Sequence, residues 1–389
     1  MLALAQALQQ RGHSALLACP ESFGPWVRSL GIAHAALGED LEAHLRASGG
    51  RLARSLAGMR EYFAEQMLMQ GPRLVELAHG ADALVGTAMA WMAKSAADKL
   101  GIAALGVLPS SCIPSRLHPP PLLPFYGLPQ WLNRWLWWLN DAAQDRLMGE
   151  PVNRARAVLG LPPIAAFTRH LFTELSQVIA ADAALLPEDP AWKGRYPYIG
   201  FAFLADPRPL EPALAAWLDA GEPPVCIGFG SMGVSVPERR ARRVCEALLR
   251  TRQRCVVIGE LAATLPENAG PEQFFVAKNV PHAALFPRCA VVVHHGGAGT
   301  MAAALRAGVP QVVLPVMLDQ FHHAHHLVRA RLAVPATRLS RVSAPGLAEA
   351  VKRARELPDE PRKAFAARLQ QERAGDLFIE HLQQLVAAG

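Results

Sequence analysis

The residue types best suited to binding an anion are concentrated in one stretch of the chain, residues 290–324. An apolar run that predicts a buried strand leads directly into the segment HHGGAGT, residues 294–300, and a helical pattern follows. Glycines let a ligand approach the backbone closely, and the unpaired N–H groups at a helix start point toward it. The helix dipole adds about half a positive charge at that end. The sequence therefore predicts a phosphate site at this turn.

Two side chains of this segment add to the main-chain donors. The imidazole of His295 and the hydroxyl of Thr300 would supplement the N–H groups of the helix start. The spacing matches neither the GxxxxGK[ST] pattern of P-loop enzymes nor the GxGxxG pattern of dinucleotide-binding folds. We therefore expect a phosphate-bearing ligand, but neither a P-loop ATPase nor an ordinary dinucleotide-binding fold.

A second glycine-rich turn, GFGSM at residues 228–232, ends another apolar run in the same way. At the carboxyl end of a strand, Ser231 would face the same ligand as the histidine–glycine turn. Taken alone, the motif is equally consistent with a tight strand–helix connection that binds nothing. Paired with the first turn, it is interpreted as a second edge of one phosphate site.

Composition and charge exclude several classes of protein. Of the 389 residues, 51% are hydrophobic and 19% charged, which is enough for two or three domains with sizeable cores. The net charge of +6 is scattered, without the clustered basic stripe of a nucleic-acid-binding protein. The six cysteines show no CxxC spacing, so we expect reduced thiols and a cytoplasmic protein. No apolar run reaches the roughly 18 residues that span a bilayer.

Short apolar runs alternate with helical patterns in both halves, which predicts α/β domains with doubly wound parallel sheets. The expected strands are residues 15–18, 83–85, 103–107, 225–229, 255–258, 274–276, 290–294 and 311–314. Prolines at 201–212 indicate a linker, so we expect domains 1–205 and 206–389 with a ligand cleft between them. Prolines at 114–129 predict a long surface loop.

Two clusters of side chains have competing interpretations. Four tryptophans crowd the helical pattern after the proline-rich loop: Trp131, Trp135, Trp137 and Trp138. Core packing is the first interpretation, and acceptor binding or contact with a bilayer surface is the alternative. The segment FHHAHH, residues 321–326, places histidines one helical turn apart, but no carboxylate follows at metalloprotease spacing. We expect no metal there.

The residues around the turn carry a resemblance to a known family. Residues 275–324, FVAKNVPHAALFPRCAVVVHHGGAGTMAAALRAGVPQVVLPVMLDQFHHA, resemble the donor-binding segment of bacterial nucleotide-sugar glycosyltransferases, which include glycopeptide, macrolide and sterol transferases. The likeness extends to GFGSM, to residues 11–23 and to GLPQWLNRWLWWLND at 127–141. It implies the GT-B fold, in which two Rossmann-like domains face each other across a cleft. Residues 1–205 would bind the acceptor and residues 206–389 the nucleotide-sugar donor.

The resemblance also implies roles for particular residues. The positions that contact the donor's phosphates in that family are Ser231, His295, Gly297, Gly299 and Thr300 in this sequence. An Asp-Gln pair holds the sugar hydroxyls in the family, and it matches Asp319 and Gln320. That role is chemically sensible, because a carboxylate and an amide together accept from and donate to a polyol.

The sequence departs from the family pattern in three places. Ala303 stands where the plant enzymes have a glutamate for the ribose, so UDP and dTDP both stay open. His323 replaces the asparagine that commonly follows the Asp-Gln pair. The first strand and its catalytic loop have no counterpart, because Met1 already matches the helix after that loop, and the general base is unassigned. We expect a start codon placed too far downstream, and we interpret His13 as structural rather than as a substitute base.

The function implied is inverting, metal-independent transfer of a hexose from a UDP- or dTDP-sugar, with no cofactor. The acceptor would be a hydroxyl of an apolar small molecule, such as a secondary metabolite, or of a lipid, and peripheral membrane contact is an accompanying expectation. Two rivals are a non-catalytic nucleotide-sugar-binding pseudo-enzyme that lacks the base and a nucleotide-sugar epimerase on the same fold.

Overall fold

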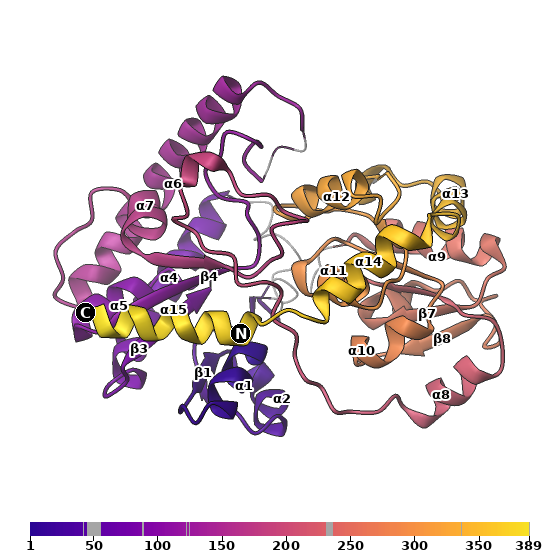
Figure 1. The fold of residues 1–389 in the computed structure, drawn as a ribbon, viewed down its shortest axis with the longest axis horizontal. Helices are drawn as coiled ribbons and strands as arrows, with labels where there is room; N and C mark the ends of the chain where they lie inside the picture. Colours follow the sequence, from indigo (N-terminus) through magenta and orange to yellow (C-terminus); the bar gives the residue numbers. More distant parts are fainter. Residues whose placement is uncertain are drawn as a thin grey trace. The chain divides into compact units, whose positions relative to one another are not determined.

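The computed structural model describes all residues except 42, 45–55, 88, 122, 124, 231–235, 336 and 389. The described residues form two compact units, each made of more than one chain segment (Figure 1). Unit 1 comprises Met1–Pro120, Gly127–Ala205 and Arg373–Gly389, and unit 2 comprises Pro121–Tyr126 and Asp206–Glu372. The chain thus divides between residues 205 and 206, whereas its C-terminal segment, which the sequence places in the second domain, belongs with unit 1.

Unit 2 is built on one sheet of five parallel strands in the order β10-β9-β6-β7-β8. The strands are β6 (Val225–Gly228), β7 (Cys255–Ile258), β8 (Phe274–Ala277), β9 (Val291–His294) and β10 (Gln311–Val313). Every residue of β9 and β10 is buried, as expected of a parallel sheet that helices cover on both faces. The five strands lie where the apolar runs of the second half predict them.

Helices cover both faces of this sheet. They are α8 (Pro212–Asp219), α9 (Glu238–Thr251), α10 (His282–Leu285), α11 (Ala298–Arg306), α12 (Gln320–Arg329), α13 (Ala344–Arg355) and α14 (Asp359–Leu369). Alternate strand residues face opposite cores, because successive side chains of a strand point to opposite faces. Ile227 and Val293 pack with α9 and α13, while Cys226 and Val292 pack with α8, α10 and α11. This is the doubly wound arrangement that the sequence predicts.

Unit 1 contains two separate parallel sheets in the described residues. One pairs β1 (Leu16–Cys19) with β2 (Ala33–Ala36), and the other has the order β3 (Ala83–Thr87), β4 (Ala103–Leu108), β5 (Ser176–Ile179). No residue of β1 or β2 is buried, in contrast to the strands of unit 2. The absence of a central strand from this domain stays a prediction.

The α-helices of unit 1 that the described residues form surround these sheets. They are α1 (Leu2–Gln10), α2 (Gly24–Ser29), α4 (Leu56–Leu77), α5 (Ala93–Leu100), α6 (Gln130–Val158), α7 (Phe167–Arg169) and α15 (Ala374–Ala388). On one face of β4, Leu4 of α1 and Phe378 of α15 share a core with Leu105. On the other face α4, α5 and α6 supply a second core, which includes Met67, Ala96 and Val152. In the described part of the chain, no helix is long and apolar enough to cross a membrane.

Short helical segments complete both units. The 3-10 helices are Glu21–Phe23, Pro190–Trp192, Gly259–Thr264, Phe286–Arg288 and Leu339–Arg341, and His170–Glu174 is a π-helical turn.

The proline-rich segment after β4 is the expected loop, but only part of it lies on the surface. It is irregular, but Ser115 and His118 are only 6% and 4% exposed. The Ser115 hydroxyl donates to Asp189 at 2.7 Å, and the Trp137 indole donates to the His118 carbonyl at 2.9 Å. Side-chain hydrogen bonds replace the regular ladder that prolines cannot complete, and Ser115 and residues 118–120 are buried, whereas residues 116, 117, 127 and 129 are exposed.

Candidate anion-binding site

The predicted turn joins a buried strand to a helix, as its sequence indicates. β9 ends at His294, and α11 begins at Ala298 after the N-cap residue Gly297. No side chain caps this helix, and its first backbone bond runs from Met301 N–H to the Gly297 carbonyl at 2.9 Å. The preceding N–H groups of the first turn therefore have no acceptor within the helix, and they are available to a ligand.

Gly299 and Thr300 contribute two of these unpaired N–H groups. Gly299 is exposed, and a Cβ placed on it would meet no atom within 4 Å, so open space lies in front of the helix start. Thr300 is half-buried in the same turn. Unpaired donors, an aligned helix dipole and open space are together the requirements of an anion site.

The glycines before the helix are required by close packing. Gly296 has φ +93°, which side-chain-bearing residues rarely adopt, and a Cβ on it would lie 3.2 Å from the Gln320 carbonyl oxygen. A Cβ on Gly297 would lie 2.4 Å from Nε2 of His295, so the imidazole could not occupy its place. These glycines bring the turn against both His295 and the start of α12.

The side chain of His294 holds the turn in shape. Its Nδ1 accepts from Gly296 N–H at 3.1 Å, so the ring proton is on Nε2, which donates to Oε1 of Gln311 at 2.9 Å. Complete burial lowers the pKa of His294 to about 3. The ring is therefore neutral near pH 7, and it leaves the Gly296 N–H unavailable to a ligand.

His295 is the buried polar side chain that the turn leaves without a partner. It is 7% exposed, and its Nδ1 makes no hydrogen bond among the described residues. Burial lowers its pKa to about 4, while the carboxylate of Asp319 acts in the opposite direction. A Cβ on Gly230 would lie 3.6 Å from Cε1 of the ring, so the GFGSM turn approaches His295. Ser231 itself lies outside the described residues.

The Asp-Gln pair lies at the start of α12. Asp319 is the N-cap residue and is half-buried. Gln320 is 5% exposed, and its Oε1 accepts from the N–H groups of Val316 at 2.9 Å and Met317 at 3.1 Å. The amide oxygen is thus committed to the loop before α12, and the amide nitrogen is the part of Gln320 that can still meet a ligand.

His323 is a site residue whose role the sequence does not predict. It is fully buried, its Nδ1 donates to the Gly296 carbonyl at 2.7 Å, and its Nε2 has no hydrogen-bond partner in the described residues. The sequence marks it only as a departure from asparagine. The available signal was its position one helical turn after Asp319, which places both residues on the same side of α12.

The structure thus assembles the predicted residues that it describes from three elements of unit 2. The turn after β9 contributes His295 and Gly297, the first turn of α11 contributes Gly299 and Thr300, and α12 adds the Asp-Gln pair. The close approach of Gly296 to the main chain of Gln320 joins the first and last of these.

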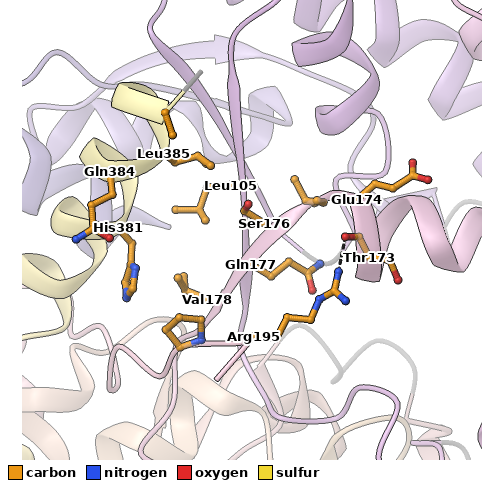
Figure 2. A pocket seen from close by; sticks show the side chains of 13 residues that line it. Leu105, Thr173, Glu174, Ser176, Gln177, Val178, Arg195, His381, Gln384 and Leu385 are labelled. Atoms are coloured by element: carbon orange, nitrogen blue, oxygen red, sulfur yellow. Dashed lines mark hydrogen bonds between the residues drawn. The ribbon is translucent and has the colours of Figure 1, made fainter. Parts of the chain in front are cut away.

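A groove of about 560 Å³ lies elsewhere, on unit 1, between α15 and the start of β5 (Figure 2). Gln177 of β5 lines it, and its Nε2 donates to the Leu171 carbonyl at 2.9 Å, while its buried Oε1 has no partner in the described residues. His381 and Gln384 of α15 and Arg195 surround the opening (Figure 2). No residue predicted from the sequence lines this groove, so it is separate from the candidate site.

Comparison with known sequences identifies close relatives of the chain. Residues 254–385 match the family described as the C-terminal domain of erythromycin biosynthesis protein CIII-like proteins. The chain is 34% identical over 340 residues to glycosyltransferase GtfE of Amycolatopsis orientalis, covering 86% of this chain and 81% of that protein. It is 32% identical over 344 residues to vancomycin aglycone glucosyltransferase of the same organism, with the same coverage. Sterol 3-beta-glucosyltransferase UGT80B1 of Arabidopsis thaliana is 28% identical over 391 residues, covering 90% of this chain and 60% of that protein.

Solved structures show the same architecture. The glycotransferase of kitacinnamycin superposes with a TM-score of 0.74 at 20% identity, covering 98% of this chain and 95% of that one. Glycosyltransferase VinC, solved in complex with dTDP, superposes with a TM-score of 0.67 at 20% identity, covering 100% and 96%. At these identities the likeness establishes the fold.

Proposed function

Since the chain belongs to the bacterial glycosyltransferases of the GT-B fold, we propose that it transfers a hexose from a UDP- or dTDP-sugar to a hydroxyl of an apolar small-molecule or lipid acceptor. The membership confirms the expected fold of two Rossmann-like domains and the expected enzyme class. Nucleotide-sugar dependence and a natural-product or sterol type of acceptor follow from the family. The choice of nucleotide, inversion at the sugar carbon and independence from metal belong to the proposal.

The two units are assigned different roles in this proposal. Unit 2 binds the donor, because the open helix start and the unpartnered His295 both lie there. Unit 1 binds the acceptor. The same proposal includes peripheral contact with a membrane, since apolar acceptors partition into bilayers, and a reducing, cytoplasmic location, which six free cysteines support.

The observation that carries the donor site is a buried, unpartnered imidazole beside unpaired N–H groups of a helix start. In glycosyl transfer the departing nucleoside diphosphate gains negative charge as the bond to the sugar breaks. Fixed donors aimed at that charge stabilise the transition state without reorganising. Because the pKa of His295 is about 4, its ring is neutral near pH 7. It therefore acts as a hydrogen-bond donor, alongside the N–H groups of Gly299 and Thr300.

The remaining predicted residues complete the donor site. We assign Ser231 to the phosphates, on the strength of Gly230 lying beside His295. Asp319 accepts from sugar hydroxyls through its half-buried carboxylate, and Gln320 donates to them through its amide nitrogen only. An acceptor hydroxyl must lose its proton during the attack, and no residue is assigned to that step.

Product analysis tests the proposal directly. The chain is incubated with UDP-glucose or dTDP-glucose and a hydroxylated apolar acceptor such as a sterol, and the products are identified by mass spectrometry. A glycosylated acceptor together with free nucleoside diphosphate is the expected result. An isomerised sugar formed without acceptor would identify an epimerase, and nucleotide binding without any turnover would identify a pseudo-enzyme. Either of these last two results would overturn the proposed transfer.

A further inference from the structure

Three tryptophans on α6 are exposed along one side of the helix. Trp131, Trp135 and Trp138 have 69%, 50% and 63% of their surface exposed. Their spacing of four and then three residues places them in one stripe, which Leu139, 38% exposed, extends. Single exposed apolar residues are ordinary, but a contiguous aromatic stripe marks an interaction surface. We call these four residues the tryptophan face.

The opposite side of α6 is the side that anchors the helix. Asn133 and Trp137 are 1% and 5% exposed. The Asn133 amide donates to the Arg116 carbonyl at 2.9 Å, and the Trp137 indole donates to the His118 carbonyl. Core packing therefore explains Trp137 alone among the four tryptophans. The tryptophan face has no role in holding α6 in place.

The charge beside the tryptophan face is positive. The charged residues exposed between residues 130 and 146 are Arg134 and Arg146. The carboxylates of this segment are less exposed than the two arginines: Asp141 and Asp145 are both half-buried, and Asp145 accepts from the N–H and hydroxyl of Thr168 at 2.8 and 3.0 Å. An anionic surface is therefore the partner whose charge complements this face.

The chemistry of these side chains suits the boundary between lipid headgroups and acyl chains. A tryptophan ring is largely apolar but carries one N–H donor, and it concentrates at membrane interfaces for that reason. In the described part of the chain, the indole N–H groups of the three exposed tryptophans donate to no protein acceptor. Arginines with apolar stems extend from such a surface to anionic headgroups.

We propose that the tryptophan face, with Arg134 and Arg146, docks on the surface of a bilayer that contains anionic lipid. The helix lies in the headgroup region with its aromatic side immersed, in the manner of interfacial amphipathic helices. The inference deepens the membrane contact of the proposed function, and it would give the enzyme access to acceptors dissolved in the bilayer. Membrane binding itself needs neither donor nor acceptor.

Vesicle sedimentation of the full chain tests this docking. Vesicles of phosphatidylcholine and phosphatidylglycerol in equal parts are compared with vesicles of phosphatidylcholine alone. We expect binding to the mixed vesicles that weakens as salt is added, because surface charges are screened. Replacing all three residues, Trp131→Ser, Trp135→Ser and Trp138→Ser, should reduce binding by about a hundredfold, since partition scales with the apolar area immersed. Arg134→Glu with Arg146→Glu should abolish the preference for the anionic vesicles.

A matched variant tests whether vesicle binding depends on the tryptophan face or on exposed apolar side chains in general. Phe23, Met69 and Met89 are 41%, 51% and 56% exposed elsewhere on unit 1, and their replacement by serine should leave vesicle binding unchanged. Phenylalanine at the three tryptophan positions should preserve most of the binding. Circular dichroism and thermal unfolding, measured on each variant, verify that the chain is folded.

Three results would overturn the inference. One is equal sedimentation of the wild type and the triple serine variant. Another is loss of binding in the matched variant to the same degree. The third is a wild type that ignores both kinds of vesicle yet forms a dimer that the serine variant cannot form, which would make this face a contact between copies. This experiment measures no sugar transfer, so absence of vesicle binding would not count against the proposed glycosyltransferase activity. Conversely, absence of that activity would not change the interpretation of vesicle binding.

Discussion

Two buried histidines, His294 and His323, shape the candidate site at the scale of single residues. His294 accepts one main-chain N–H of the turn and donates to Gln311, and His323 donates to the carbonyl of Gly296. Both bonds fix the Gly296 peptide and leave the N–H groups that follow it unpaired. Because the pKa values of His294 and His295 are about 3 and 4, the attraction for an anion at pH 7 comes from aligned peptide dipoles and N–H donors rather than from a charge on either of these rings.

Replacing His295 tests the phosphate role of its ring. We expect His295→Ala to weaken the binding of UDP or dTDP by about 1–3 kcal/mol, because one hydrogen bond to a charged group is lost. Isothermal titration calorimetry measures this change. His13→Ala is the control, since that histidine is exposed on unit 1 and its ring lies 3.4 Å from the amide nitrogen of Gln383. Equal affinity of the His295 variant and the wild type would reject the phosphate role.

Replacing His323 tests whether its hydrogen bond holds the turn. His323→Ala should lower the free energy of unfolding by about 1–3 kcal/mol, because the buried Gly296 carbonyl loses its donor. His323→Asn retains an N–H donor at that position, so it should recover much of both the stability and the nucleotide affinity. Denaturant unfolding and calorimetry measure the two quantities. If alanine and asparagine behaved alike, the Gly296 contact would not be the function of this side chain.

At the scale of elements, the sequence predicts those helices, strands and turns that are determined by residues close together in the chain. β7 has the bounds that its apolar run indicates, and the valines and glycines around residue 295 predict the strand, the turn and the helix start. β2 and β5 are not predicted: AHAA has no β-branched residue, and SQVI ends in valine and isoleucine but has only four residues. Their place is fixed by pairing with β1 and β4.

The parts of the site that the sequence does not predict are contacts between elements. Gln311 reaches His294 because β10 lies beside β9 in the sheet, and this pairing is a tertiary feature. The bonds from Val316 and Met317 to Gln320 depend on how the loop folds back on α12. The family resemblance of the sequence indicated Gln320 as a site residue, but it could not indicate that the amide oxygen is already occupied.

The strand-to-helix turn predicts a pH dependence of stability. The pKa of His294 is about 3 in the folded state, well below about 6.5 for an unfolded chain. Between these values the unfolded state binds the proton and the folded state does not, so stability falls as the pH falls. The loss from this one residue is at most about 1.4 kcal/mol per pH unit. His295 acts in the same direction down to its pKa of about 4.

Denaturant unfolding at pH 7 and pH 5 measures this effect. His294→Gln retains a donor and an acceptor but does not titrate, so the difference in stability between the wild type and this variant should shrink as the pH falls. Parallel losses of stability in both proteins would show that His294 does not carry the dependence.

At the scale of the whole molecule, each unit has cores of its own. The sheet of unit 2 is covered on both faces by its own helices, and unit 1 is completed by α15, which follows unit 2 in sequence but packs with Leu4 and Leu105. A chain that returns in this way gives each unit a separate set of buried contacts. Units with independent cores are expected to unfold as separate cooperative transitions.

Because the cores are separate, a destabilising substitution in one core should lower the unfolding temperature of that unit alone. Phe378 of α15 is 1% exposed and Leu248 of α9 is fully buried, so Phe378→Ala should destabilise unit 1 and Leu248→Ala should destabilise unit 2, each by about 2–5 kcal/mol. Differential scanning calorimetry with and without UDP identifies the transitions, because a ligand raises only the transition of the unit that binds it. If unit 2 binds the donor, UDP should raise the temperature of the transition that Leu248→Ala lowers. The temperature of the transition that Phe378→Ala lowers should stay unchanged. The two units would unfold as one body if there were a single transition whose temperature both substitutions lower and UDP raises. The assigned roles would be reversed if UDP raised the temperature of the transition that Phe378→Ala lowers.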